Sequence, residues 1–146
     1  MRSPYSHPQQ LIMDLEADYS QLTRARSRIR QWLTGCGAVD GVDEVLLVVH
    51  EILANAIEHG NDGSGGHVEV RLRWEEQKVS IHVRDQGKAP DPPQVVPAQE
   101  AGECGRGLAI VEALAHSWGA TTQRRGRSVW ATLTCGPGGQ ELRRAA

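Results

Sequence analysis

Hydrophobic and polar positions along the first half of this chain predict one strand and two helices. Leu11, Met13 and Leu15 occupy every second position, which is typical of a short strand. Apolar residues then recur at helical spacing between residues 22 and 33, and again across residues 43–59. The second of these helices carries apolar residues over most of its surface, so we expect it to be well buried.

The next part of the chain predicts a hairpin and a long loop. Residues 68–74 and 79–83 both alternate between apolar and polar positions. They are joined by the short linker Glu75-Glu-Gln, so we expect two antiparallel strands. Residues 86–103 show no periodicity and contain several prolines, which predicts a long segment without regular structure.

The remaining elements complete an α+β pattern. A short apolar helix is expected over residues 108–115, followed by two strands around residues 120–124 and 128–134. Because the strands are joined mainly through hairpins, the expected fold is a two-layer sandwich. Its helices would lie on one face of a mostly antiparallel sheet.

Length, charge and composition narrow the possible functions. The 146 residues make one domain, which we place at 9–135 between flexible ends at 1–8 and 136–146. A net charge of −2 disfavours direct nucleic-acid binding. There is no apolar run for a membrane span or a signal peptide, and the three cysteines lack metal or disulfide spacing. We therefore expect a cytoplasmic protein that contacts no membrane.

Two polar side chains interrupt the apolar helix over residues 43–59. Glu51 and Asn55 are one helical turn apart on the same face, and His59 extends this line. A carboxamide oxygen is a suitable ligand for Mg²⁺, and a neighbouring carboxylate accepts protons from hydroxyl groups. Taken alone, the pair is better explained by a helix edge that meets solvent, because Glu-x-x-x-Asn is a weak pattern.

Asp85 is the second polar position of interest. It has the same parity as the core-facing Val83, so its carboxylate should point into the core, where it needs a hydrogen-bond donor. The exocyclic amine of adenine is one such donor, and Gly87 would let a ligand approach the backbone closely. Alternatively, Asp85 caps the turn that leaves the strand.

A glycine motif, Gly105-Arg-Gly107, precedes the apolar helix that continues from Leu108. Backbone N–H groups at a helix N-terminus bind anions, and Arg106 would add a charged fork for a phosphate. Glycines also begin helices for steric reasons, so this motif is weak alone. Combined with Asn55, it predicts a nucleotide pocket.

In this order, the motifs resemble those of the Bergerat-fold ATPases, the group that holds gyrase and histidine kinases. Within the group, the run His50-Glu-Ile-Leu-Ala-Asn-Ala-Ile-Glu-His-Gly60 is similar to the bacterial anti-sigma-factor serine kinases. Gly105-Arg-Gly-Leu-Ala-Ile-Val111, with Trp118-Gly119 and Gly126-Arg-Ser-Val-Trp130, resembles the actinobacterial type. The resemblance covers about residues 9–134.

The resemblance implies a role for each motif. Glu51 would be the base that activates a serine hydroxyl of a protein substrate. Asn55 would hold Mg²⁺ at the phosphates of ATP, with His59 on the same side of the pocket. Asp85 would bind the adenine amine, with Gly87 beside it. The phosphates would be held by Gly105, Arg106, Gly107 and Leu108.

The resemblance also implies a function and partners. Such proteins hold a sigma factor inactive and phosphorylate an antagonist protein, so that the partners switch and transcription changes. Homodimers are common among them, and residues 9–34 would form the interface. The usual second glycine of the adenine motif is absent here, because Lys88-Ala89 follow Gly87. The alternative is therefore a non-catalytic ATP-binding module, or a nucleotide-free interaction module, of the same fold.

Overall fold

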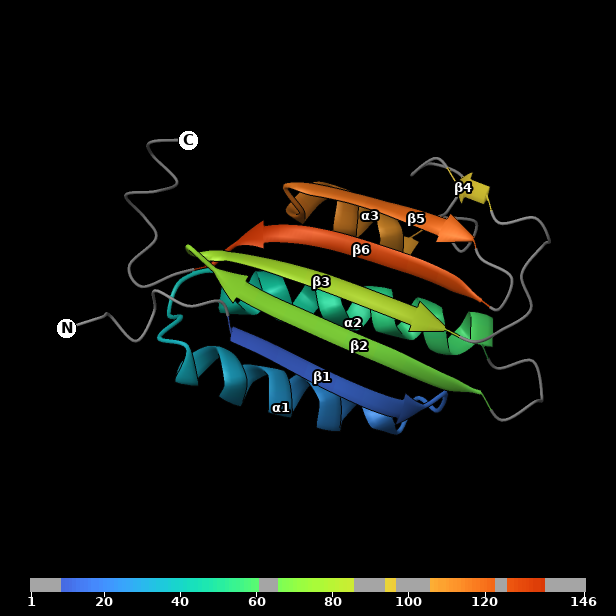
Figure 1. Ribbon diagram of the computed structural model, residues 1–146, viewed down its shortest axis with the longest axis horizontal. Helices are drawn as coiled ribbons and strands as arrows, with labels where there is room; N and C mark the ends of the chain where they lie inside the picture. The colour runs from blue at the N-terminus through green and yellow to red at the C-terminus, as the bar shows by residue number, and fades with distance from the viewer. Residues whose placement is uncertain (1–8, 61–65, 86–93, 97–105, 123–125, 136–146) are drawn as a thin grey trace.

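A computed structural model describes residues 9–60, 66–85, 94–96, 106–122 and 126–135 (Figure 1). Along these ranges the elements are β1 (Gln9–Glu16), α1 (Gln21–Gly35), α2 (Val42–Gly60), β2 (His67–Glu75), β3 (Lys78–Asp85), β4 (Gln94–Val96), α3 (Arg106–Leu114), β5 (Ser117–Thr122) and β6 (Arg127–Thr134). The ends predicted to be flexible, 1–8 and 136–146, lie outside the described residues.

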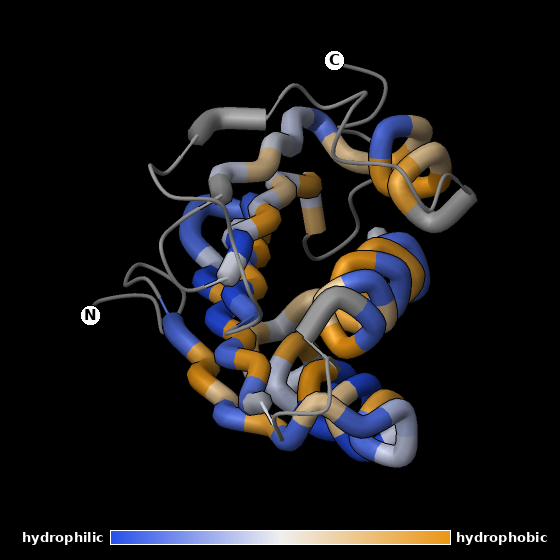
Figure 2. Tube along the Cα trace, turned by 90° about the vertical axis from the view of Figure 1, so that its right-hand side faces the viewer, coloured by the Kyte–Doolittle hydropathy of each residue, from blue (hydrophilic) through white to orange (hydrophobic). Residues whose placement is uncertain are grey.

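The strands form one sheet with the order β1-β2-β3-β6-β5-β4, and every neighbouring pair is antiparallel. The helices cover one face of this sheet, with α2 over its centre (Figure 1). Figure 2 shows hydrophobic residues on the sides of the helices and strands that face each other. The predicted two-layer α+β sandwich is confirmed.

Alternation in β2 and β3 determines which side chains reach the core. Strand register places Val70 opposite Val83 and Val68 opposite Asp85, and all four side chains are buried. One face of each strand therefore packs under α2, while the other carries mainly charged residues. This parity brings the carboxylate of Asp85 to the inner face, as the sequence pattern predicted.

The largest differences from the sequence prediction are at β4 and at the start of β5. Residues 94–96 form β4, so the expectation of no regular structure from 86 to 103 is wrong there. These three residues lie between Pro93 and Pro97 and pair on one side only, with β5, so no proline interrupts the ladder. Strand β5 begins at Ser117, earlier than predicted, because its pairing with β6 extends to Thr132.

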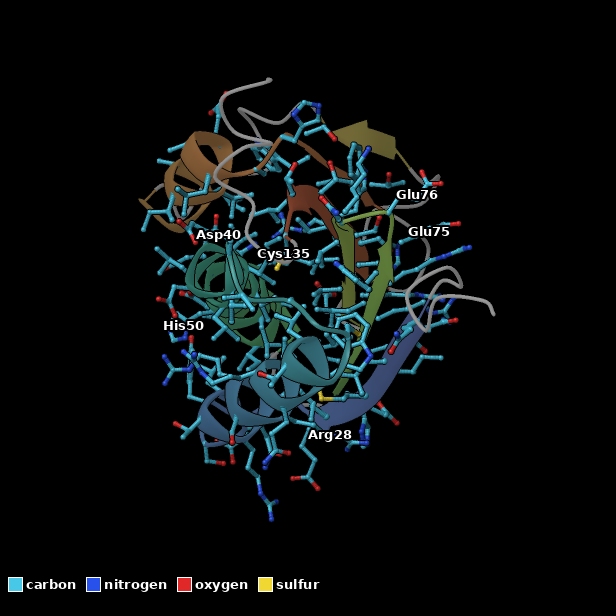
Figure 3. All side chains as sticks on the ribbon, turned by 90° about the vertical axis from the view of Figure 1, so that its left-hand side faces the viewer. Arg28, Asp40, His50, Glu75, Glu76 and Cys135 are labelled. Carbon is cyan, nitrogen blue, oxygen red and sulfur yellow. The ribbon has the colours of Figure 1, made fainter. Side chains whose placement is uncertain are left out.

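Two of the cysteines, Cys36 and Cys135, are buried free thiols, and Cys135 lies at the end of the molecule seen in Figure 3. Cys36 donates a hydrogen bond to the side-chain oxygen of Gln9 at 3.2 Å, and burial raises its pKa. Burial also raises the pKa of Cys135, to about 11, with smaller contributions from Glu44 and Asp40. Both thiols therefore stay protonated at neutral pH. Cys104 lies outside the described residues.

The turn between β2 and β3 uses an unfavourable backbone conformation. Glu76 and Gln77 have φ values of 53° and 64°, although both carry a Cβ atom. A left-handed conformation costs such residues about 1–2 kcal/mol each. The turn lies at the same end as Cys135 (Figure 3), and the carbonyl of Gln77 accepts a hydrogen bond from the Cys135 N–H at 2.7 Å.

We expect the double substitution Glu76→Asn and Gln77→Gly to stabilise the protein by about 1 kcal/mol, because Asn-Gly adopts this turn readily. Urea unfolding should show a higher midpoint with an unchanged slope. The control is Glu75→Asn on the adjacent exposed strand position, which should not raise the midpoint. A double variant that unfolds at or below the wild-type midpoint would contradict the prediction.

Candidate functional site

Helix α2 carries Glu51 and Asn55 at the border between its buried and exposed faces. Its inner face packs on the sheet through fully buried residues such as Val49 and Ile52. Glu51 and Asn55 are half-buried and one turn apart. The structure therefore confirms that both are on one helix, and places them next to a tightly packed face.

Asn55 has a buried polar atom that the protein leaves unsatisfied. Its Nδ2 has no hydrogen-bond partner among the described residues, although the atom is shielded from solvent. Leaving a buried donor unpaired costs about 1–3 kcal/mol, and such groups in proteins call for an explanation. A ligand with an acceptor atom for Nδ2, such as a phosphate oxygen, supplies one, so we take Asn55 as the centre of the candidate site.

Asp85 is the second component of the site. Only 1% of the residue is exposed, at the C-terminal end of β3. Its Oδ1 accepts a hydrogen bond from the backbone N–H of Arg127 at 3.1 Å, so the first residue of β6 orients the carboxylate. The turn that leaves β3 lies outside the described residues, so the alternative role of Asp85 as a cap of this turn stays a prediction.

Gly126 completes the surroundings of Asp85, and the sequence analysis did not include it among the site residues. Its φ is +93°, and a Cβ atom there would lie 1.8 Å from the Asp85 carbonyl oxygen and 2.8 Å from Oδ1. Only glycine fits between the two strands at this point. The sequence signal was present, since Gly126 ends a predicted hairpin turn, but it did not show that β6 pairs with β3.

Helix α3 begins at Arg106, two residues before the predicted start at Leu108, so Arg106 and Gly107 lie in its first turn. Leu108 is 4% exposed and belongs to the hydrophobic core. It therefore anchors the first turn of α3, which packs against α2. A buried anchor at this position orients the helix N-terminus, where backbone N–H groups are available for an anion.

These features gather at one end of the molecule. Figure 1 shows the C-terminal ends of α2 and β3 there, together with the beginnings of β6 and α3. The structure thus brings Asn55, Asp85 and the α3 start to the same end. The remaining predicted positions, namely Gly87, Gly105 and the side chains of His59 and Arg106, lie outside the described residues.

A divalent ion at this end would find few protein ligands among the described residues. Among the described residues, no three His, Cys, Asp or Glu side chains are grouped to hold a metal. The carboxamide oxygen of Asn55 suits Mg²⁺, which keeps waters and takes further oxygen ligands from bound phosphates, whereas Nδ2 suits a phosphate oxygen as acceptor. The residues present fit an ion that arrives with a phosphate ligand.

Comparisons with known proteins place these residues in context. Residues 15–133 match the family model described as the histidine kinase-like ATPase domain. The fold is similar to the RsbU and RsbW domains of Rv1364c from Mycobacterium tuberculosis, with a TM-score of 0.66 and 24% identity. That match covers 87% of this chain and 32% of the other, so the chain spans about a third of that structure.

A second solved structure has the same fold at lower similarity. It is the histidine kinase domain of a blue-light activated histidine kinase from Erythrobacter litoralis EL346, with a TM-score of 0.50 and 22% identity. This match covers 79% of this chain and 59% of the other. A search of curated proteins found no match. No helix among the described ranges is long and apolar enough to cross a membrane.

Proposed function

The chain belongs to the histidine kinase-like ATPase domain family, and from this premise we propose that it binds Mg-ATP and phosphorylates a serine of an anti-sigma factor antagonist. The observation that supports nucleotide binding most directly is the unsatisfied amide of Asn55. It lies on α2, which ends where Asp85 is oriented by β6. A site that leaves a polar group unpaired without ligand is arranged for the bound state.

Each described residue has a defined task in this proposal. Asp85, oriented by the Arg127 N–H, accepts a hydrogen bond from the exocyclic amine of adenine. Asn55 holds Mg²⁺, which neutralises phosphate charge when bound. The N-terminus of α3, anchored by Leu108, faces the phosphates.

Glu51 supplies the step that makes the protein a kinase. It lies one turn before Asn55 on α2, so its carboxylate is close to the proposed phosphate position. Glu51 accepts the proton of the serine hydroxyl while the serine oxygen forms a bond to the γ-phosphorus. The bond between that phosphorus and the bridging oxygen of ADP breaks, and ADP leaves.

The proposed partners follow from the motif resemblance and from the fold. The chain would inhibit a sigma factor in the cytoplasm and phosphorylate the antagonist that competes for it, so that transcription is regulated by partner switching. The similarity to a structure that contains an RsbW domain supports this assignment. Glu51, one helical turn before Asn55, favours a serine kinase over a non-catalytic module of the same fold.

Mg-ATP should raise the midpoint of thermal unfolding, because it binds only the folded state; at 100 times its dissociation constant it stabilises by about 2.7 kcal/mol. We expect Asn55→Ala to lose most of this shift. The ligand-free variant should itself be more stable by about 1 kcal/mol, because the buried unpaired amide is removed.

The matched control is Glu58→Gln, an exposed position on the same helix, which should keep the wild-type shift. A purely structural Asn55 would give the opposite pattern, with the alanine variant less stable and its Mg-ATP shift intact. If millimolar Mg-ATP leaves the wild-type midpoint unchanged, the nucleotide-free interaction module becomes the better assignment.

A further inference from the structure

A groove runs between α1 and α2 on the side of the helical layer away from the sheet. Its volume is ≈ 590 Å³, and its lining includes Arg26 and Arg30 of α1 together with Asp43, Leu46, Leu47, His50 and Glu51 of α2. The groove therefore combines cations, an apolar surface and the carboxylate that we assign as the base. The nucleotide site does not require this combination.

The charged side chains of α1 are all positive. The helix contains four arginines and no acidic residue. Arg26 and Arg30 line this groove, whereas Arg24 and Arg28 line a separate depression between α1 and β1. In Figure 3, Arg28 lies toward β1 and His50 lies on the other side of α1. From the sequence alone, these arginines are interpreted as a solvated face, with a protein docking surface as the alternative.

The cations in the groove are only weakly neutralised. Arg30 contacts Asp43 at 3.2 Å, but the two side chains are 57% and 87% exposed, so this ion pair contributes little. Among the described residues, no ion pair involves Arg26. An acidic group that entered the groove would therefore meet one guanidinium with no ion-pair partner in the described part of the chain, and a second held only by an exposed ion pair.

The apolar part of the groove and His50 limit the choice of occupant. Leu47 is 42% exposed, beside the buried Leu46. Nδ1 of His50 is shielded from solvent and has no hydrogen-bond partner among the described residues. An occupant that covers Leu47 and neutralises Arg26 must carry apolar and acidic side chains together. A protein segment meets these requirements.

The groove ends at the proposed reaction centre. Leu47, Glu51 and Asn55 follow one another at single-turn intervals along α2. Leu47 and Glu51 line the groove, and Asn55 lies one turn further toward the nucleotide end. An occupant of the groove therefore extends toward the side on which Glu51 would accept a proton.

We propose that the α1–α2 groove binds an acidic, partly apolar segment of the protein substrate, with Leu47 against its apolar side chains and Arg26 against its carboxylates. This assignment rests on the proposed kinase function and specifies its docking surface. The segment delivers a serine hydroxyl of the same protein to Glu51. Substrate selection then depends on α1, while nucleotide binding depends on α2, β3 and α3.

The test compares two charge reversals on the same helix, Arg26→Glu in the groove and Arg28→Glu on the opposite side. The probe is a purified, fluorescently labelled anti-sigma factor antagonist from the source organism, titrated against each variant in Mg-ADP. We expect Arg26→Glu to weaken binding about tenfold or more and to raise KM for the antagonist with kcat little changed. Arg28→Glu should stay within about twofold of wild type, since rim charges away from an interface contribute little.

The Mg-ATP thermal shift separates the two hypotheses. This shift should be the same in wild type and in both variants. If wild type itself shows no shift, the proposed nucleotide-dependent function is contradicted, whereas the groove assignment is not. Equal effects of Arg26→Glu and Arg28→Glu, or no binding of the antagonist to wild type, would overturn the groove assignment. So would a change of oligomeric state in Arg26→Glu, because the groove would then hold a second copy of the chain.

Discussion

Gly126→Ala is expected to destabilise the protein by about 3 kcal/mol or more, because a Cβ atom there both clashes and strains the backbone. It would lie 1.8 Å from the carbonyl oxygen and 2.6 Å from the carbonyl carbon of Asp85. Both of these atoms belong to the backbone, so no side-chain rotation relieves the contact. The φ of +93° adds a conformational penalty for any residue other than glycine.

The clash has a functional consequence beyond stability. Relief of the contact requires β3 and the start of β6 to separate, which breaks the hydrogen bond from the Arg127 N–H to Asp85. Whatever fraction of the variant folds should therefore bind nucleotide more weakly. Urea unfolding followed by circular dichroism gives the stability, and the Mg-ATP thermal shift gives the binding.

Gly35→Ala is the matched control, because it introduces the same methyl group at the last residue of α1. Nothing lies within 4 Å of the added Cβ at this position. Alanine is favoured over glycine in helices by about 0.5–1 kcal/mol, so this variant should be unchanged or slightly more stable. Similar stability of the two variants would show that β3 and β6 are not packed as tightly as the structure indicates.

Glu51→Gln should reduce phosphorylation of the antagonist by about a hundredfold to ten-thousandfold, which is the usual contribution of a positioned general base. Glutamine has nearly the same shape and volume as glutamate, so it should fit the half-buried position of Glu51. The variant should therefore fold normally and keep its Mg-ATP thermal shift. The measurement is the single-turnover rate of phosphoserine formation at saturating ATP and antagonist.

Glu58→Gln removes the same charge from an exposed position on the same helix and should phosphorylate at the wild-type rate. A Glu51→Gln variant that still transfers phosphate at this rate would exclude Glu51 as the base. If Glu51→Gln also loses the Mg-ATP thermal shift, Glu51 takes part in nucleotide binding and not in proton transfer. Together with Asn55→Ala, these variants test binding and transfer separately.

Periodicity predicted the parts of the site that depend on neighbours in the chain. Helical spacing was enough to place Glu51 and Asn55 together, and strand parity was enough to turn Asp85 inward, because both follow from the geometry of one element. The start of α3 was likewise visible in Gly105-Arg-Gly107. Each of these predictions needed only a short window of sequence.

Features that depend on distant partners were not predictable in this way. The hydrogen bond from Arg127 to Asp85 joins residues 42 positions apart, and it requires β6 to insert beside β3. Pairing with β5 also decides whether residues 94–96 form a strand, since so short a segment has no periodicity of its own. The α1–α2 groove was not predicted, because arginines at alternate positions of a helix have the same sequence pattern as an ordinary solvated face.

The position of β6 in the sheet also has a consequence for synthesis of the protein on the ribosome. Helix α2 and strands β2 and β3 emerge long before β6, yet β6 lies between β3 and β5 in the finished sheet. A nascent chain that ends before residue 127 has Asn55 and Asp85 but lacks the backbone donor that orients Asp85. Prematurely terminated products should therefore not bind nucleotide, and binding competence should arise only as the last described strand leaves the ribosome.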